Sequence, residues 1–431
     1  MNDTIVATSA VAPEGAPLVL SQSQALLERA RAKIPGVTLS MMKRPEHFAP
    51  GSFPVYLARG EGARVEDVDG NSYVDFVCGL GANSLGHGHP ALLAAAREAL
   101  EVGFVHSLPT AHEPQTAELF TELVPFAEMV RFFKTGADAT SAAVRLARAI
   151  TGKERLITVG YNGWHDHFMF DTPGVPRAVA ELTRRMPLFR EADEPALLDA
   201  VAAQGSELAA VIVSVPYNRI ISAEFLRRLR EACRDRGALF VLDEIVTGFR
   251  VALGGVQELH GVAPDLACYS KALAAGMPLS AIAGPARHLS VMDRLQVSTT
   301  FGGETLSLAV CRAALRIYRD TPFIDQLSRL GQRLRDGVNA VAQVEGAPLR
   351  VQGYDAMPLF SFSSDLGLHS RLMQEFQGQM ARRGVLLRRD VNFICGAHRD
   401  ADIELTIAAA QASMRSMADS GAFELTGAGE P

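Results

Sequence analysis

The sequence predicts an α/β protein with a mostly parallel sheet and a smaller C-terminal α+β domain. Short, almost continuous apolar runs alternate with amphipathic helix patterns between about residues 129 and 283, as is typical of parallel strands covered on both faces. After about residue 322 the pattern changes to long helices that flank short strands. The composition, 48% hydrophobic and 21% charged over 431 residues, is that of a globular protein large enough for more than one domain.

The first part of the chain is predicted to be an arm followed by a hairpin. Residues 1 to about 20 are rich in Ala, Pro and Ser, so we expect a mobile arm. From about residue 53, two apolar runs flank Asp69-Gly70-Asn71, a sequence typical of a tight turn. These features define a predicted N-terminal segment over 1–77.

The predicted large domain covers 78–322 and contains the alternating strands and helices. One helix begins near 138 and ends at Gly152, a typical helix stop, and a second covers 222–236. The predicted strands are 129–133, 155–159, 209–215, 238–243, 266–269 and 280–283.

The predicted small domain covers 323–431. Its periodicity indicates helices over 323–343, 366–383 and about 400–418, and strands over 357–363 and 385–388.

Charge and cysteine usage exclude several classes of protein. The chain has 42 basic and 48 acidic residues, a net charge of −6, without a basic block, so a nucleic-acid partner is not expected. No apolar run approaches the ~20 residues of a membrane span, and the N-terminus lacks the features of a secretory signal. The five cysteines are far apart in sequence, which favours free thiols in a reducing compartment. We therefore expect a cytoplasmic protein.

Candidate site residues follow the predicted strands, because ligands of open α/β sheets bind at the carboxyl ends of the strands. Gly136 follows the strand 129–133 and allows a tight turn into the next helix, whose first N–H groups can bind an anion; an ordinary loop is the alternative. Asp243 and Glu244 follow the strand 238–242, and a buried carboxylate there needs a cation or several donors. A capping role for the following turn is equally open.

Two further residues complete the set of strand ends. Lys271 follows the strand 266–269, where an amine can act as a nucleophile, although most lysines simply lie on the surface. Tyr161 follows the strand 155–159, where its ring could stack on a planar ligand or serve only for packing. An anion site, an aromatic ring, a carboxylate and a lysine at successive strand ends together fit pyridoxal 5′-phosphate (PLP).

Longer motifs carry a family resemblance over nearly the whole chain. They include VEDVDGNSYVDFV (65–77), LGHGHP (85–90), VRLARAITGKE (144–154), DEIVTGFRVALGGVQELHGVAPDLA (243–267) and TTFGGETLSLA (299–309). In these motifs the sequence resembles the class III, or ω-type, PLP-dependent aminotransferases, particularly those similar to glutamate-1-semialdehyde 2,1-aminomutase. The resemblance implies PLP-dependent transferase fold type I, with PLP as the cofactor.

The resemblance also implies a role for individual residues. Lys271 matches the lysine that forms a Schiff base with PLP and moves the substrate proton, and Asp243 matches the partner of the pyridine nitrogen. Tyr161 and Ile245 are implied to pack on the two ring faces. The phosphate is implied to bind the backbone amides of Gly136 and Ala137 and, from a neighbouring subunit, Thr300. This last contact implies a homodimer with shared active sites.

Substrate recognition is expected to differ from that of the aminomutases. Ser40 and Lys43 stand where aminomutases carry a serine and a carboxylate-binding arginine, and a lysine lacks the bidentate geometry of arginine. Asn162 and Ser214 replace a histidine and a glutamate of the family pattern, and Trp164 is expected to line the substrate entrance.

We therefore predict an aminotransferase that moves an amino group from an amino donor, such as an amino acid, to an aldehyde or ketone such as a sugar or specialised metabolite. Glutamate-1-semialdehyde 2,1-aminomutase is the alternative within the same family. Outside it, His87-x-His89 and His165-Asp166-His167 leave open a metal hydrolase, although a turn or surface role is favoured and no metal is predicted. A non-catalytic descendant of the fold is disfavoured by the presence of Lys271, Asp243 and Tyr161 together.

Overall fold

A computed structural model describes residues 17–424 of the chain. The predicted N-terminal arm therefore lies largely outside the described residues. The described chain divides into two compact units, each considered separately below. Unit 1 contains the N-terminal residues to Leu80, the segment Leu85–His89 and the chain from Arg329 onward, whereas unit 2 contains Gly81–Ser84 and Pro90–Ser328.

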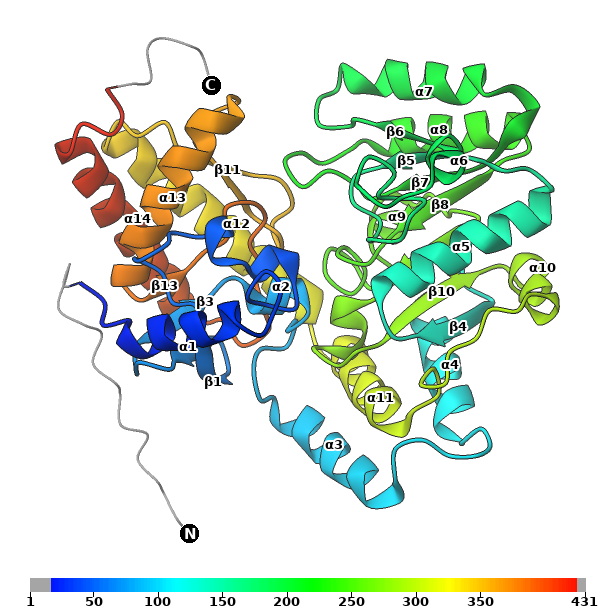
Figure 1. Ribbon diagram of the computed structural model, residues 1–431, viewed down its shortest axis with the longest axis horizontal. Helices are drawn as coiled ribbons and strands as arrows, with labels where there is room; N and C mark the ends of the chain where they lie inside the picture. Colours follow the sequence, from blue (N-terminus) through cyan, green and yellow to red (C-terminus); the bar gives the residue numbers. More distant parts are fainter. Residues whose placement is uncertain (1–16, 425–431) are drawn as a thin grey trace. The chain divides into compact units, whose positions relative to one another are not determined.

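Unit 2 is built on a seven-stranded sheet with the strand order β4-β10-β9-β8-β7-β5-β6 (Figure 1). The strands β6, β5, β7, β8 and β9 pair in parallel, whereas β10 is antiparallel to both of its neighbours. This arrangement confirms the predicted α/β class and the mostly parallel sheet. The strands are β4 (Met129–Phe133), β5 (Arg155–Val159), β6 (Thr183–Met186), β7 (Leu208–Val213), β8 (Leu239–Asp243), β9 (Leu266–Tyr269) and β10 (Ser280–Gly284).

The central strands of unit 2 are buried along their whole length, as their apolar sequences require. All residues of β7, β8 and β9 are buried, which is the pattern of a sheet covered on both faces. The larger helices of the unit are α3 (Pro90–Val102), α4 (His112–Leu123), α5 (Gly136–Thr151), α7 (Asp193–Ala203), α8 (Ala223–Asp235) and α11 (Thr305–Asp320).

Helix α5 is the helix that most directly positions the candidate site. Thr135 is its N-cap, and Thr135 and Asp138 form a reciprocal capping box that fixes the first turn. Its alanine-rich inner face, including Ala139, Ala143 and Ala147, is buried in the core of the unit. Gly152 ends the helix in a left-handed conformation.

Unit 1 combines both ends of the described chain in one four-stranded sheet, β1-β2-β3-β13. The strands β1 (Leu57–Glu61), β2 (Arg64–Asp67) and β3 (Ser72–Asp75) are antiparallel neighbours, and β13 (Val385–Leu386) joins β3 in parallel. Asp67 accepts the amides of Asp69 and Asn71, which closes the turn that the sequence indicated.

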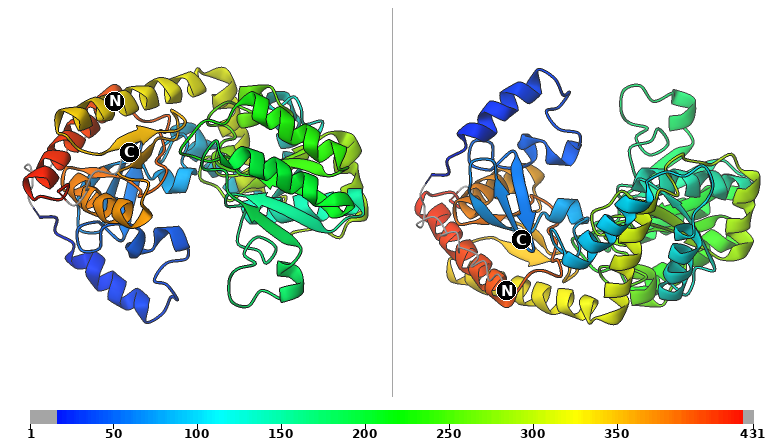
Figure 2. Two further views of the ribbon diagram at one scale, coloured as in Figure 1. Left: turned by 90° about the horizontal axis from the view of Figure 1, so that it is seen from above. Right: turned by 90° about the horizontal axis from the view of Figure 1, so that it is seen from below.

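The helices of unit 1 come mainly from the C-terminal part of the chain. Figure 2 shows α13 and α14, in orange and red, in the same unit as the blue strands. The helices are α1 (Ser21–Arg31), α12 (Phe323–Val344), which crosses the boundary between the units, α13 (Leu366–Arg382) and α14 (Asp400–Asp419); β11 (Arg350–Gln352) and β12 (Leu359–Ser361) form a separate pair.

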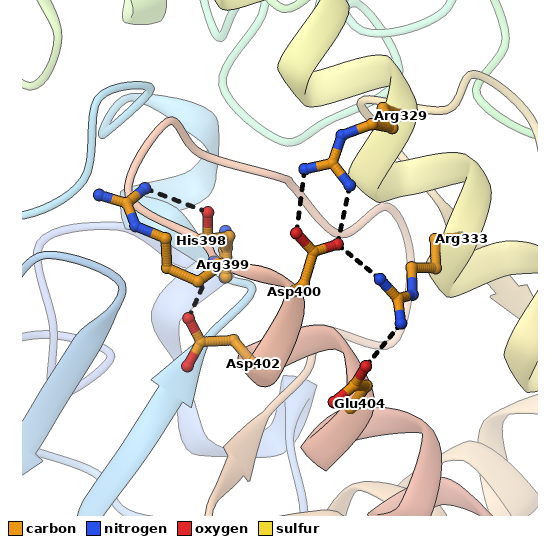
Figure 3. Close-up of polar contacts among 7 residues, drawn as sticks. All are labelled: Arg329, Arg333, His398, Arg399, Asp400, Asp402 and Glu404. Atoms are coloured by element: carbon orange, nitrogen blue, oxygen red, sulfur yellow. Dashed lines mark hydrogen bonds and ion pairs between the residues drawn. The ribbon is translucent and has the colours of Figure 1, made fainter.

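Ion pairs hold the start of α14 to α12 (Figure 3). Asp400 accepts hydrogen bonds from Arg329 at 2.7 and 3.2 Å and from Arg333 at 2.7 Å. Arg333 also donates to Glu404 at 2.5 Å. The acidic groups lie in the first turns of α14, where they also complement the helix dipole.

All five cysteines are buried free thiols. None of the helices within residues 17–424 has the length and apolar character needed to cross a membrane.

Candidate active site

Four predicted site positions follow strands of the same sheet in unit 2. Gly136 follows β4, Tyr161 follows β5, Asp243 ends β8 and Lys271 follows β9. Asp243 on β8 pairs with Cys268 on the adjacent strand β9. Lys271 is three residues after Cys268, so it lies near Asp243 at the same end of the sheet. The positive charge of Lys271 reaches Asp243 and lowers its pKa, opposing the effect of burial.

Asp243 is a buried carboxylate with a perturbed pKa. Its side chain is 5% exposed, and burial raises its pKa to about 6, against the hydrogen bonds from Asn162 and Ile245 and the charge of Lys271. Asn162 Nδ2 donates to Oδ2 at 2.9 Å, and the amide of Ile245 donates to Oδ1 at 3.1 Å. A cationic N–H donor placed against this carboxylate would favour its ionised form.

Asn162 joins three parts of the site. Its Nδ2 donates to Asp243, its Oδ1 accepts the hydroxyl of Thr158, and its backbone carbonyl accepts the hydroxyl of Thr140 on α5 at 2.6 Å. The ionised carboxylate of Asp243 can only accept, so it fixes which end of the amide faces it, and the Thr158 hydroxyl, which can donate or accept, donates to the other end. Asn162 therefore contacts the carboxylate, whereas the sequence analysis associated it with the substrate pocket.

The start of α5 is packed so closely that side chains are excluded from it. A Cβ built on Gly136 would lie 2.7 Å from Cδ1 of Ile245, and one built on Gly163 would lie 3.0 Å from Cβ of Ala137. Ile245 and the loop after β5 therefore lie directly against the first residues of the helix. The amides of Gly136 and Ala137 belong to the first turn, whose N–H groups have no partner within the helix, so they are available to an anion.

Lys271 has an unusual backbone conformation. It begins the short 3-10 helix η4 (Lys271–Ala274), with φ of +49°. A non-glycine residue in the left-handed region is uncommon, and such residues cluster at functional sites. Ser270, immediately before it, donates its hydroxyl to the carbonyl of Leu279 at 2.8 Å, which ties this loop to β10.

Tyr161 and Trp164 are exposed on the loop after β5. Tyr161 is 61% exposed and Trp164 is 68% exposed. Desolvation of the Tyr161 hydroxyl and then the charge of Asp243 raise the pKa of Tyr161, so the hydroxyl lies within electrostatic reach of that carboxylate. Trp164 packs edge-on against His165, with 4.7 Å between ring centroids.

The other predicted residues lie elsewhere in the chain. Thr300 is exposed in the turn before α11 of unit 2. Ser40 and Lys43 belong to unit 1, where Ser40 caps the 3-10 helix η1 (Met41–Lys43) and its carbonyl accepts the amide of Lys43 at 2.9 Å. Their predicted substrate roles stay predictions.

Glu244 has a structural role that the sequence left open. It is 1% exposed, and its carboxylate accepts the hydroxyl of Thr247 and the amides of Val256 and Gln257, both at 2.9 Å. Burial raises its pKa to about 7 despite these donors. Glu244 thus caps the start of α9 (Val256–His260), twelve residues further along the chain, whereas the sequence analysis held open a capping role for the turn that directly follows the strand.

The two His-x-His pairs make other contacts. His87 bonds Asp75 at 2.8 Å in unit 1, and His165 and His167 both bond the hydroxyl of Ser141, the latter at 3.1 Å. A hollow of about 430 Å³ lies beside His165 and His167 along α5, and none of the predicted site residues lines it.

Among the described residues, one group of three side chains has ligand atoms close enough for a metal ion, and it contains neither His-x-His pair. That group is Cys78, Cys395 and His398 of unit 1.

Comparison with known proteins assigns the chain to a family. Residues 48–392 match the family model "Aminotransferase class-III". The chain is 31% identical to 3-aminobutyryl-CoA aminotransferase of Cloacimonas acidaminovorans, over 92% of this chain and 97% of that protein. It is 34% identical to glutamate-1-semialdehyde 2,1-aminomutase of Sorangium cellulosum, over 91% and 96%.

Solved structures agree with this assignment. The FumI protein of Sphingopyxis sp. MTA144, solved as its PLP internal aldimine form, superposes with a TM-score of 0.87 at 28% identity, covering 93% of this chain and 98% of that one. The fold is therefore that of the PLP-dependent transaminases. The chain belongs to the class III aminotransferase family, and its cofactor is PLP.

The strand-end residues fit this cofactor. PLP supplies an electron-withdrawing ring that stabilises negative charge on the substrate carbon. Asp243 offers a buried carboxylate for a ring N–H, the first amides of α5 suit a phosphate, and Lys271 offers an amine within electrostatic reach of Asp243. A side chain at Gly136 would have to displace the end of the Ile245 side chain, whose Cδ1 would lie 2.7 Å from its Cβ.

Proposed function

We propose that this protein is an intermolecular aminotransferase that moves an amino group from an amino donor to an aldehyde or ketone acceptor. The observation that carries the proposal is the placement of Lys271 and the buried Asp243 at the ends of the adjacent strands β9 and β8. A lysine and a buried carboxylate beside a helix N-terminus supply a base, a ring partner and a phosphate site in one place.

Each residue has a proposed task. Lys271 holds the cofactor and carries the proton to and from the substrate carbon. Asp243 keeps the ring nitrogen protonated, and Asn162 orients Asp243 through the 2.9 Å hydrogen bond. Tyr161 and Ile245 cover the two ring faces, and the amides of Gly136 and Ala137 bind the phosphate.

Substrate contacts are proposed for the less buried residues. Trp164, 68% exposed, lines the substrate entrance. Ser40 and Lys43 contribute to binding a substrate carboxylate, and the point charge of Lys43 makes that contact weaker than an arginine fork would. The acceptor is proposed to be a sugar, a specialised metabolite or, by similarity to 3-aminobutyryl-CoA aminotransferase, a carbonyl compound on a larger carrier.

Glutamate-1-semialdehyde 2,1-aminomutase is the second candidate. It is supported by the 34% identity to the Sorangium cellulosum aminomutase over 91% of this chain. The lysine at position 43 and the small, buried Ser214 (6% exposed) favour the transferase, because both change positions that contact substrate in the family pattern.

Product analysis of half-reactions separates the two candidates. Protein loaded with PLP is mixed with one amino donor at a time, without acceptor, and the keto product is quantified. A transferase releases about one equivalent of keto product per subunit and loses its visible absorbance band. An aminomutase releases none with ordinary donors and responds only to a diamino or amino-aldehyde compound.

Two lysine variants control this experiment. Lys271→Ala is expected to abolish product release and the visible band, whereas Lys33→Ala, at an exposed position in α1's C-terminal turn, is expected to leave both unchanged. Release of keto product by Lys271→Ala at the unmodified rate would refute the role of Lys271.

We further propose that the protein is a cytoplasmic homodimer. Large apolar side chains at the end of α3 and beyond it are exposed in unit 2, among them Leu100, Val102, Phe104 and Leu108, each at least 49% exposed. A second copy that covered them would also bring Thr300 toward a neighbouring site. Sedimentation at micromolar concentration tests this: a monomer would contradict the dimer and the proposed role of Thr300.

A further inference from the structure

Unit 1 contains a buried cluster of two cysteines and one histidine that the proposed reaction does not use. Cys78 is 2%, Cys395 1% and His398 0% exposed. One ligand atom from each of the three lies within 4.8 Å of the others. The backbone brings the two cysteines together, because the amide of Phe393 donates to the carbonyl of Phe76 at 2.9 Å, two residues before each cysteine.

The sulfur of Cys395 is surrounded by hydrogen-bond donors. Cys78 and the amide of Ala397 lie within hydrogen-bond reach of it. The bond from Cys78 is the main cause that lowers the pKa of the Cys395 thiol well below its usual range, although burial alone would raise it. Cys395 therefore has the character of a thiolate, the form of cysteine that reacts.

The other buried cysteines provide an internal comparison. Cys268 and Cys311 are both 0% exposed, and burial raises the pKa of each thiol well above its usual value. The three thiols are therefore about equally buried, and the difference between their pKa values comes from the hydrogen-bond donors around Cys395. Selective chemistry at Cys395 follows from this difference.

The hydrogen bonding of His398 argues against a metal at this cluster. The backbone amide of Cys395 donates to Nδ1 of His398 at 2.9 Å, so Nδ1 is an acceptor and the ring proton is on Nε2. A metal on Nε2 would require the proton to move to Nδ1, where it would face the amide N–H. The ring also stacks on Phe76, with 4.5 Å between centroids, which keeps it from turning over.

We infer that Cys78 and Cys395 form a redox-active dithiol that hydrogen peroxide converts to a disulfide, with His398 as the residue that positions Cys395. The Cys395 thiolate attacks one oxygen of the peroxide, the O–O bond breaks, and hydroxide leaves to give a sulfenic acid. The sulfur of Cys78 then attacks the Cys395 sulfur, and the S–O bond breaks. The hydroxide that leaves takes the Cys78 proton, so two thiols and one peroxide give one disulfide and two waters.

The surroundings of Cys78 suit it for the second step. Its sulfur lies 3.0 Å from the carbonyl oxygen of Asp75, which is an alternative acceptor for the one thiol proton that can also reach Cys395, and its amide donates to the Asp75 carboxylate at 3.1 Å. Cys78 also begins a run of left-handed residues, with φ of 46° at Cys78, 60° at Gly79 and 63° at Leu80, which these bonds hold in place. Cys78 lies three residues before Gly81, where the chain passes from unit 1 to unit 2.

The inference is tested on the full-length holoenzyme by thiol counting. Reduced protein is treated with hydrogen peroxide, quenched, denatured and alkylated, and its intact mass and peptides are measured. Two of the five cysteines are expected to escape alkylation, and a disulfide-linked peptide is expected to join Cys78 to Cys395. All five thiols remaining free, or Cys268 reacting as fast as Cys395, would overturn the inference.

Variants make the test specific. Cys78→Ser is expected to stop the reaction at a sulfenic acid on Cys395, Cys395→Ser to leave Cys78 unreacted, and Cys311→Ser to behave as the parent protein. His398→Gln is expected to slow oxidation about tenfold for each pKa unit by which the Cys395 thiol rises. If His398→Gln oxidises at the parent rate, His398 has no positioning role.

Metal analysis of the unmodified protein supplies a further test. Purified holoenzyme is expected to contain no stoichiometric zinc or copper. One equivalent of either metal per chain, lost on Cys395→Ser, would overturn the redox-active dithiol in favour of a metal site.

Discussion

Asn162→Ala would remove one of the N–H donors that reach the buried Asp243 and would leave the apolar core intact. A hydrogen bond to a charged group contributes about 1.5–3 kcal/mol, and one pKa unit corresponds to about 1.4 kcal/mol. The variant should therefore raise the pKa of Asp243, already raised to about 6 by burial, by a further one to two units or so. At pH 7 the carboxyl group would change from mostly ionised to largely protonated in the cofactor-free protein.

The sign of the stability effect follows from proton binding. Because the pKa of folded Asp243 lies above its ordinary value of 3.8, the folded protein binds more protons than the unfolded chain between the two values, and stability falls as the pH rises through that range. In Asn162→Ala the stability continues to fall up to a pH about one to two units higher than in the parent protein. The Thr158 hydroxyl also loses its acceptor in the variant, which lowers the free energy of unfolding at every pH. The effect of Asp243 is therefore the further loss of about 1.5–3 kcal/mol between pH 4 and pH 8.5.

Two measurements check this prediction. Urea unfolding of the cofactor-free protein between pH 4 and 8.5 gives the stability difference, and spectroscopic titration at pH 7 gives the PLP affinity. The affinity is expected to fall about 10- to 100-fold. Asn218→Ala is the matched control, because Asn218 lies in the same unit and donates only to the backbone carbonyl of Phe189, at 3.0 Å. Identical pH dependence and PLP affinity in Asn162→Ala and the parent would refute the reasoning.

Three further substitutions have defined outcomes. Asp243→Asn should stabilise the cofactor-free protein by about 3 kcal/mol above pH 6 and by little below pH 4, since the raised pKa penalises the ionised form; a pH-independent gain in urea unfolding would contradict this. Gly136→Ala should lower the free energy of unfolding by about 1–3 kcal/mol, because the new methyl group packs too closely against Ile245. Adding Ile245→Val to the same chain should recover much of this loss, because valine lacks the Cδ1 that would collide. If the two substitutions instead lower the melting temperature additively, the contact is not the cause. Tyr161→Ala should weaken PLP binding about 2- to 10-fold, and Tyr161→Phe should not, if stacking rather than the hydroxyl matters; equal losses would contradict a stacking role.

The apolar strands and the amphipathic helices were predictable because their signals are local. The strand 266–269 and the start of the helix at 323 match the structure, and the helix 222–236 differs by a residue at each end. The start of α5 lies two residues before the predicted 138, because Thr135 and Asp138 form a capping box. The spacing of Thr135 and Asp138 is itself a sequence signal for that earlier start.

Features that depend on distant partners were not predictable in the same way. Strand β6 has the sequence Thr-Arg-Arg-Met and no apolar run, as is common for an edge strand protected by charge. The pairing of β13 with β3 places C-terminal residues in the same sheet as the N-terminal hairpin, whereas the sequence indicated separate segments with boundaries at 77 and 322. Those boundaries stay predictions about the larger organisation of the chain.

The role of Asn162 shows the same limit within the site. Asn162 contacts Asp243 only because β7 lies between β5 and β8 and holds their ends at a fixed separation. A sequence shows that an asparagine replaces the histidine of the family pattern, but it does not show which neighbour the amide faces. The amide cannot titrate near neutral pH, so any pH dependence of the hydrogen bond between Asn162 and Asp243 comes from Asp243.

Asp243 and Glu244 are adjacent in sequence and equally buried, yet their hydrogen bonds assign them different tasks. Glu244 accepts one hydroxyl and two amides, all from residues 247–257, which uses most of the positions that a carboxylate offers to donors. Asp243 accepts one side-chain amide and one backbone amide and lies within reach of the charge of Lys271. A buried carboxylate with fewer donors gains more from an added cationic N–H than one that is already satisfied. The ring nitrogen of PLP is such a donor when protonated, so cofactor binding should lower the pKa of Asp243 more than that of Glu244, and this difference is the physical reason to assign the ring partner to Asp243.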